Sequence, residues 1–200
     1  MGARLQGAHE SLDVMSRVEW SCPDGASSRW TPVAMAPTHI VVHHSAMWPN
    51  IGPECIREIW RFHAIEREWG DIGYHYLIDA AGNVFRGRAE CSVAAHESIG
   101  AHVKLHNGAS IGICTLGNFS ERWPTDAALA TLRRALTALC ATWAIDPLGV
   151  GALGESQGAR ISGHRDWTPT TECPGHHLYA LLDGLRNATA LHLVRARGAS

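Results

Sequence analysis

The chain has 200 residues, of which 46% are hydrophobic and 18% charged, and its formal net charge is -2. This length suits one domain with a substantial core, and the composition is that of a globular protein rather than a disordered one. The balanced charge excludes a strongly basic field, so we expect neither nucleic acid nor a membrane as a partner. No apolar run reaches the length of a membrane span, and the N-terminus shows no signal peptide, which leaves the compartment open.

Histidine and cysteine are the residue types that bear most on function. There are thirteen histidines, and histidine is the commonest metal ligand in proteins. The six cysteines form no CxxC pair. Cys114 lies in an apolar run and Cys140 on a helix face, so we expect both to be thiols buried in the core. Cys22, Cys55 and Cys91 could pair in an oxidising compartment, and the sequence leaves their pairing open.

The first clear element follows a loop-like N-terminal stretch. Residues 1–30 lack periodicity and include "SCPDGASS", a loop composition, whereas "THIVVHH" at 38–44 reads as a buried strand. Side chains alternate along a strand, so His43 and His44 point to opposite faces. Either one of them is a ligand or base in a site, or both are ordinary polar residues at a strand end.

A helix is predicted over residues 52–68, with Pro53 in its first turn. Its apolar stripe continues into His63 and Arg67 at the same angular position. A helix whose stripe turns polar either leaves the core to enter a cleft or simply reaches the surface.

The remaining elements alternate between strands and helices. A hairpin is predicted over 73–88, a buried strand over 110–119 and a long helix capped by Thr125. Residues 149–160 form a Gly-rich loop, and the chain is helical again after Pro174. This order predicts an α/β (α+β) single domain, with a central mixed β-sheet flanked by helices.

His164 and Cys173 flank the polar stretch "GHRDWTPTTECPG". Imidazole and thiolate together suit zinc, although a spacing of nine is not that of a zinc finger. Three protein ligands from distant strands, with a fourth position open, are typical of a catalytic zinc site rather than a structural one.

Five segments in order carry a resemblance: "THIVVHHSA", "FHAIEREWGDIGYHYLID", "GNVFRGR", "IGAHVKLHNGASIGICTLGNF" and "GHRDWTPTTECPG". Together they resemble the peptidoglycan recognition protein family, which shares its fold with type-2 N-acetylmuramoyl-L-alanine amidases and phage lysozyme-type amidases. The likeness starts near "MSRVEW" and implies a domain over residues 15–187, with tails at 1–14 and 188–200.

The resemblance implies a zinc-dependent amidase that cuts the amide between N-acetylmuramic acid and L-Ala of the stem peptide. By position, its zinc ligands would be His43, His164 and Cys173. Binding-only members often lose the cysteine, which this chain keeps. The implied partner is peptidoglycan or its muropeptides, acted on at a cell wall or outside a cell, and we expect a monomer.

Two more residues take catalytic roles by the resemblance. Tyr74 would donate its phenolic hydrogen to the developing oxyanion, a contribution of about 3 kcal/mol. Thr171 stands where phage members carry a lysine and many animal amidases a threonine. The structural alternatives are a strand tyrosine packed on the core and a loop threonine that satisfies backbone groups.

The resemblance also implies a groove for the stem peptide. Its walls would include six residues: His63, Arg67, Trp69, Tyr74, His102 and Asn107. Arg67 and Arg88 are candidates for binding peptide carboxylates. Trp69 is typical of members that bind diaminopimelate-type peptides, whereas Glu68 replaces the usual glycine. As alternatives, Trp69 could cover the core and Arg88 could be a hairpin-end charge, while His44 should pack or hydrogen-bond beneath the site.

Two alternatives to the amidase stay open at this point. One is a non-catalytic receptor for peptidoglycan or muropeptides on the same fold. The other is a structural zinc module, which would normally have a fourth protein ligand.

Overall fold

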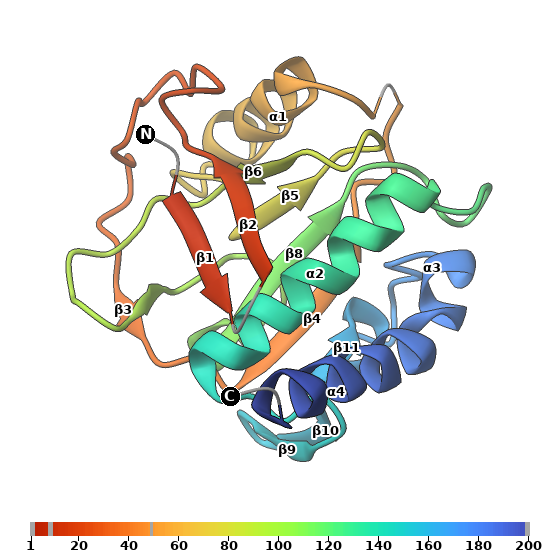
Figure 1. The fold of residues 1–200 in the computed structure, drawn as a ribbon. Helices are drawn as coiled ribbons and strands as arrows, with labels where there is room; N and C mark the ends of the chain where they lie inside the picture. The colour runs from red at the N-terminus through yellow and green to blue at the C-terminus, as the bar shows by residue number, and fades with distance from the viewer. Residues whose placement is uncertain (1–2, 8–9, 49, 199–200) are drawn as a thin grey trace.

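The computed structural model describes residues 3–7, 10–48 and 50–198. Its centre is a seven-stranded sheet in the order β1-β2-β6-β5-β8-β4-β11, and two small two-stranded sheets lie beside it (Figure 1). The strands of the central sheet are β1 (Ala3–Gly7), β2 (Glu10–Met15), β4 (His39–His44), β5 (Tyr76–Ile78), β6 (Val84–Arg86), β8 (Ser110–Thr115) and β11 (Ile161–Gly163). The small sheets pair β3 (Ala34–Met35) with β7 (Glu97–Ser98), and β9 (Val150–Leu153) with β10 (Ser156–Ala159).

The helices connect these strands and cover them. They are α1 (Pro53–Trp60), a π-helix (Arg61–Glu66), a 3-10 turn (Asn107–Ala109), α2 (Asp126–Trp143), a second 3-10 turn (His164–Asp166), α3 (His176–Ala180) and α4 (Leu182–Gly198). Among the described helices, none combines the length and apolarity needed to cross a membrane. The predicted mixed sheet flanked by helices is therefore confirmed.

Four neighbouring strands of the sheet run parallel. β11 pairs in parallel with β4, β4 with β8, and β8 with β5. Their carboxyl ends therefore meet at one edge, and such an edge is where open α/β sheets generally bind their ligands. His43 and His44 end one of these strands, so the sheet topology places the histidine pair at that edge.

The two faces of the sheet are covered by different helices. Ile40 and Val42 of β4 belong to an apolar core that also contains residues of α2 and α4. Figure 1 shows both helices crossing this face of the sheet. On the opposite face, a second cluster joins Ile56 and Ile59 of α1 to Cys114 of β8. Because side chains alternate along β4, His43 points to the α1 face.

The predicted elements match the structure closely in the middle of the chain. The strand at 38–44, the hairpin at 73–88 and the strand at 110–119 are all present as β4, β5–β6 and β8. Thr125 caps α2 as predicted, because its side chain accepts a hydrogen bond from the Ala128 amide at 3.1 Å. The predicted helix at 52–68 is present, but its second half has π rather than α geometry.

The structure differs from the sequence prediction at three places. Residues 3–7 and 10–15, expected in a loop-like tail, form strands β1 and β2, and β2 pairs in parallel with β6. The Gly-rich segment at 149–160 forms the β9–β10 hairpin. Helix α4 continues to Gly198, through residues expected as a C-terminal tail.

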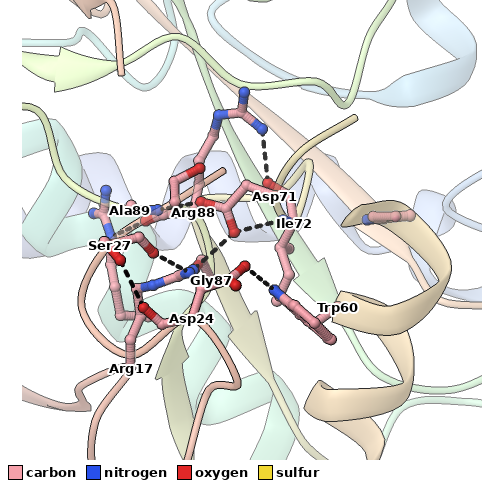
Figure 2. A network of polar contacts seen from close by, with 12 residues as sticks. Arg17, Asp24, Ser27, Trp60, Asp71, Ile72, Gly87, Arg88 and Ala89 are labelled. Atoms are coloured by element: carbon pink, nitrogen blue, oxygen red, sulfur yellow. Dashed lines mark hydrogen bonds and ion pairs between the residues drawn. The ribbon is translucent and has the colours of Figure 1, made fainter. Parts of the chain in front are cut away.

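A polar network attaches the loop after β2 to the segments that precede β5 and follow β6 (Figure 2). The buried Arg17 guanidinium lies 2.9 Å from Asp71 and also donates to the backbone carbonyls of Ser27 and Gly87. Asp71 in turn accepts a hydrogen bond from the Ala89 amide. A buried charge that keeps its partner and hydrogen bonds is tolerated, whereas removing one partner is strongly destabilising. The network therefore fixes segments that are far apart in the sequence.

Candidate metal centre

Three side chains from separate segments meet at the carboxyl edge of the sheet. His43 lies in β4, His164 begins the 3-10 turn after β11, and Cys173 follows in the next loop. Their ligand atoms lie within 4.8 Å of one another. Within the described part of the chain, this is the one group of three or more such side chains that is close enough to hold a metal ion.

Burial sets the protonation of the three groups. Desolvation lowers the pKa of His43 well below its usual value, and lowers that of His164 to about 4. Both imidazoles are therefore neutral at neutral pH, which is the form that binds metals. Burial also raises the pKa of the Cys173 thiol to about 12. A coordinated cation reverses this last effect, because a thiol bound to a metal loses its proton.

The geometry of the three residues fits a zinc ion. The Cys173 sulfur lies 3.6 Å from Nδ1 of His43 and accepts a hydrogen bond from the His44 amide at 3.4 Å. The ring centroids of His43 and His164 are 4.7 Å apart. Imidazole nitrogen and thiolate sulfur are donors that zinc prefers, and catalytic zinc sites have three protein ligands with the fourth position left for water or substrate. The residues present therefore suit this metal.

Tyr74 and Thr171 both lie next to the candidate ligands. The Tyr74 ring is 5.0 Å from that of His43, and burial raises the pKa of its hydroxyl well above the ordinary value. Tyr74 is therefore a hydrogen-bond donor throughout the neutral range. The Thr171 hydroxyl accepts a hydrogen bond from the Cys173 amide at 3.2 Å, so it orders the loop that carries the cysteine.

A row of rings leads from the metal centre along the end of the first helix. His63 lies 5.3 Å from Tyr74 and 4.7 Å from Trp69, measured between ring centroids. Trp69 is 40% exposed, whereas His63 is buried and its Nδ1 accepts a hydrogen bond from the Gly73 amide. The π-helix brings His63 to this row, and π-helical turns are frequent at functional sites. Arg67, at the end of the π-helix, is exposed and lies over the Phe62 ring.

Arg88, a candidate for binding a peptide carboxylate, is buried rather than open to solvent. Its side chain is only 2% exposed, donates to the Ile72 carbonyl at 2.9 Å and lies 4.2 Å from the Trp30 ring centroid. Burial lowers the pKa of this guanidinium to about 10. Its backbone amide donates to the Tyr74 carbonyl, so the Arg88 backbone lies next to one end of the row of rings.

His102 and Asn107 belong to one loop beside the centre. The Asn107 side-chain oxygen accepts hydrogen bonds from the His102 and Val103 amides at 2.8 and 3.0 Å. The His102 ring is buried, and its Nδ1 lies 3.0 Å from Nε2 of His43. His102 thus lies directly against a candidate ligand, and Asn107 holds the backbone that carries it.

The segment that contains all of these candidates also matches a known family. Residues 33–176 match the family model of N-acetylmuramoyl-L-alanine amidases. The chain belongs to this family. The matched segment includes His43, His164 and Cys173, so the candidate metal centre lies wholly inside the amidase-family segment.

Individual relatives agree with this assignment. Peptidoglycan-recognition protein SC1a/b of Drosophila simulans is 31% identical over 181 residues, which cover 88% of this chain and 86% of the relative. The Mus musculus protein named N-acetylmuramoyl-L-alanine amidase is 31% identical over 161 residues, covering 76% of this chain and 27% of that protein. A solved mutant of Drosophila PGRP-LB in complex with tracheal cytotoxin aligns with a TM-score of 0.65 at 29% identity, over 85% of this chain and 92% of that chain. The chain therefore has the fold of the peptidoglycan recognition proteins.

Three features of this amidase-family domain were not predicted from the sequence. Cys114 is a core thiol as predicted, but its direct register with His43 on the neighbouring strand was not predicted. His75 is fully buried, accepts a hydrogen bond from the Gly112 amide and contacts the Ser98 carbonyl through its other ring nitrogen. The third is the contact between His102 and His43. As predicted, His44 makes a hydrogen bond beneath the site, which its Nδ1 accepts from a backbone amide.

Proposed function

We propose that the chain is a zinc-dependent N-acetylmuramoyl-L-alanine amidase. It hydrolyses the amide that joins N-acetylmuramic acid to the L-Ala of the peptidoglycan stem peptide. The observation that carries this proposal is the convergence of His43, His164 and Cys173 in an amidase-family domain, with the Tyr74 ring beside them. A zinc ion held by these three ligands would supply Lewis-acid polarisation of the amide carbonyl and of a water molecule.

The protein's own groups hold the reacting atoms and stabilise charge. Neutral His43 and His164 supply lone pairs without a proton to displace, because burial keeps their pKa values low. The His44 amide donates to the Cys173 sulfur, which stabilises negative charge on it. Tyr74 keeps its proton, so it donates a hydrogen bond to the carbonyl oxygen as that oxygen gains negative charge.

The stem peptide is expected to lie along the row of rings. His63 and Trp69 offer faces on which a peptide can pack, and Arg67 is an exposed cation for a peptide carboxylate. The complex of the PGRP-LB mutant with tracheal cytotoxin supports a muropeptide as the ligand class. Arg88 is buried, with its guanidinium over the Trp30 ring, so the exposed Arg67 is the better candidate for a peptide carboxylate.

Digestion of purified cell walls tests the proposal. The protein should release stem peptides that begin with L-Ala and leave glycan strands intact, as mass spectrometry of the products will show. A chelator should stop the release, and added zinc should restore it. Binding to the walls without release of peptides would contradict the proposal and identify the chain as a muropeptide receptor.

Cys173→Ser tests the ligand assignment. A hydroxyl is a far weaker zinc ligand than a thiolate, so we expect turnover to fall to the level of the chelated parent protein. Binding to walls should remain, because the row of rings lies on other segments. Cys91→Ser, at a cysteine outside the site, is the matched control and should cleave like the parent. Cleavage by Cys173→Ser at the parental rate would show that Cys173 is no ligand.

A further inference from the structure

His102 makes the closest contact to the ring nitrogen of His43 that faces away from the metal centre. Nε2 of His43 lies 3.0 Å from Nδ1 of His102, and the two rings meet edge to face at 86°. On its other side, Nε2 of His102 lies 3.2 Å from the backbone carbonyl of Ser110. The three groups form one line of hydrogen bonds that starts in β8 and ends in β4.

The acceptor at the end of this line fixes the direction of every bond in it. A backbone carbonyl only accepts, so Nε2 of His102 carries the proton that it donates to Ser110. The Ser110 hydroxyl, 3.5 Å from the same nitrogen, donates to the His106 carbonyl and therefore also presents a lone pair to His102. A neutral His102 protonated on Nε2 has a lone pair on Nδ1, and only the Nε2 proton of His43 can bond to it.

The consequence for His43 is a single tautomer. With its proton on Nε2, its other ring nitrogen, Nδ1, is left with a free lone pair. That Nδ1 is the atom 3.6 Å from the Cys173 sulfur, on the metal side of the ring. A free imidazole in water exchanges between tautomers, and the unfavourable one presents a proton to the cation instead of a lone pair.

The His102 ring has little freedom to leave this arrangement. A methyl group added at Gly112 would lie 2.5 Å from its Cγ, and one added at Gly100 would lie 2.5 Å from its Cδ2. The absence of a side chain at these two glycines thus lets the backbone pack directly against the ring. The His102 amide is held by the Asn107 side chain, so the backbone that carries the ring is fixed too.

We propose that His102 is a positioning residue for the metal, which fixes the tautomer and orientation of His43 so that Nδ1 is the zinc-binding atom. This inference rests on the proposed zinc site and adds to it a residue outside the ligand set. Groups that orient metal-binding histidines in this way typically contribute about 10- to 100-fold in metal affinity. The sequence prediction for His102 was a groove wall, but its side chain is 7% exposed and faces the ligand.

Two substitutions at His102 test whether zinc affinity depends on the hydrogen-bond acceptor at Nδ1 or only on the packing of a ring. His102→Phe keeps the ring but removes the acceptor, so we expect zinc to bind about 10- to 100-fold more weakly. His102→Asn places a carbonyl oxygen near the position of Nδ1, so it should retain most of the parental affinity. Zinc dissociation constants are measured by competition with a chromophoric chelator. Urea unfolding of the metal-free proteins shows whether each variant is folded.

A second measurement needs no variant of His102. Long-range proton–nitrogen NMR spectra of the metal-free parent report which ring nitrogen of each histidine carries the proton, and the His43 signals are assigned by their loss in His43→Ala. We expect His43 to be protonated on Nε2 and His102 on Nε2.

The possible outcomes distinguish this inference from the proposed function. Parental zinc affinity in folded His102→Phe, or a proton on Nδ1 of His43, would overturn the role of His102 and leave the amidase proposal standing. A parent protein that binds no zinc, or binds zinc without cleaving walls, would instead contradict the proposed function. Weak zinc binding in His102→Phe with recovery in His102→Asn supports the positioning role.

Discussion

Tyr74 is the residue whose chemistry can be tested most directly. Its ring lies 5.0 Å from that of His43, and its raised pKa keeps the hydroxyl protonated. If it donates to the oxyanion, Tyr74→Phe removes about 3 kcal/mol of transition-state stabilisation, or roughly 10²-fold in kcat, with a smaller change in KM. Steady-state kinetics on a soluble muropeptide will measure both constants.

Tyr76→Phe is the matched control for that substitution. Tyr76 lies two residues along the same strand region, is buried, and accepts a hydrogen bond from the Arg86 guanidinium at 3.0 Å. Its loss should lower the free energy of unfolding by about 1 kcal/mol and leave kcat unchanged. Equal loss of kcat in both variants would show that Tyr74 acts through packing rather than as a donor.

At the level of single residues, the sequence predicts which side chains belong to the site better than it predicts what each side chain contacts. His43, His164 and Cys173 could be predicted because their order along the chain matches a family pattern, and the structure brings them together. The burial of Arg88 under Trp30 and the hydrogen bond between His102 and His43 could not be predicted. Both depend on side-chain contacts between segments that only the folded sheet makes neighbours.

The turn after the π-helix carries local strain at Glu68. Its φ is +56°, in the left-handed region, where the family pattern has a glycine. A side chain in this region is unfavourable by about 1–2 kcal/mol, whereas glycine is unfavourable by about 0.5–1 kcal/mol through its entropy in the unfolded chain. Glu68→Gly should therefore raise the free energy of unfolding by about 0.5 kcal/mol, as urea denaturation can measure.

Glu68→Ala separates this backbone effect from the loss of the carboxylate. Alanine keeps the Cβ atom, so it should give no such stabilisation. The two variants would have equal stability if the charge rather than the backbone were responsible. Because Trp69 follows directly and lines the row of rings, wall binding by both variants shows whether the turn also sets the position of that tryptophan.

The elements that the sequence predicts well are those whose signals are local. The periodicity and cap of α2 and the apolar run of β4 are of this kind. The β9–β10 hairpin contains three glycines, which favoured a loop prediction, and it is a strand pair because the backbones of its two halves pair with each other. β2 is stabilised by pairing with β6, some seventy positions away along the sequence. No local pattern specifies such a partner.

Several histidines are buried near the edge of the central sheet at which its parallel strands end. His63 lies in the π-helix, His44 at the end of β4 and His75 just before β5, and none is more than 9% exposed. Each is hydrogen-bonded as a neutral imidazole acceptor to a backbone amide, from Gly73, Phe119 and Gly112 respectively. The folded protein has thus buried several groups that would gain charge in mild acid.

This burial predicts how stability depends on pH. Desolvation lowers the pKa of His44, His63 and His75 to about 4, whereas an unfolded chain titrates near 6.5. Between these values the unfolded state binds protons that the folded state does not, so stability is complete above about pH 6.5 and is lost as pH falls towards 4. Each such histidine adds a slope of up to about 1.4 kcal/mol per pH unit.

Urea denaturation of the metal-free protein between pH 7.5 and 5 will measure this slope, and His75→Gln tests its origin. Glutamine does not titrate and can still donate to the Ser98 carbonyl. The variant's free energy of unfolding should therefore depend less steeply on pH, by up to about 1.4 kcal/mol per pH unit, whatever its value at pH 7.5. His96→Gln, at an exposed histidine, should keep the parental slope. Parallel curves for the parent and His75→Gln would show that His75 is not buried as a neutral group.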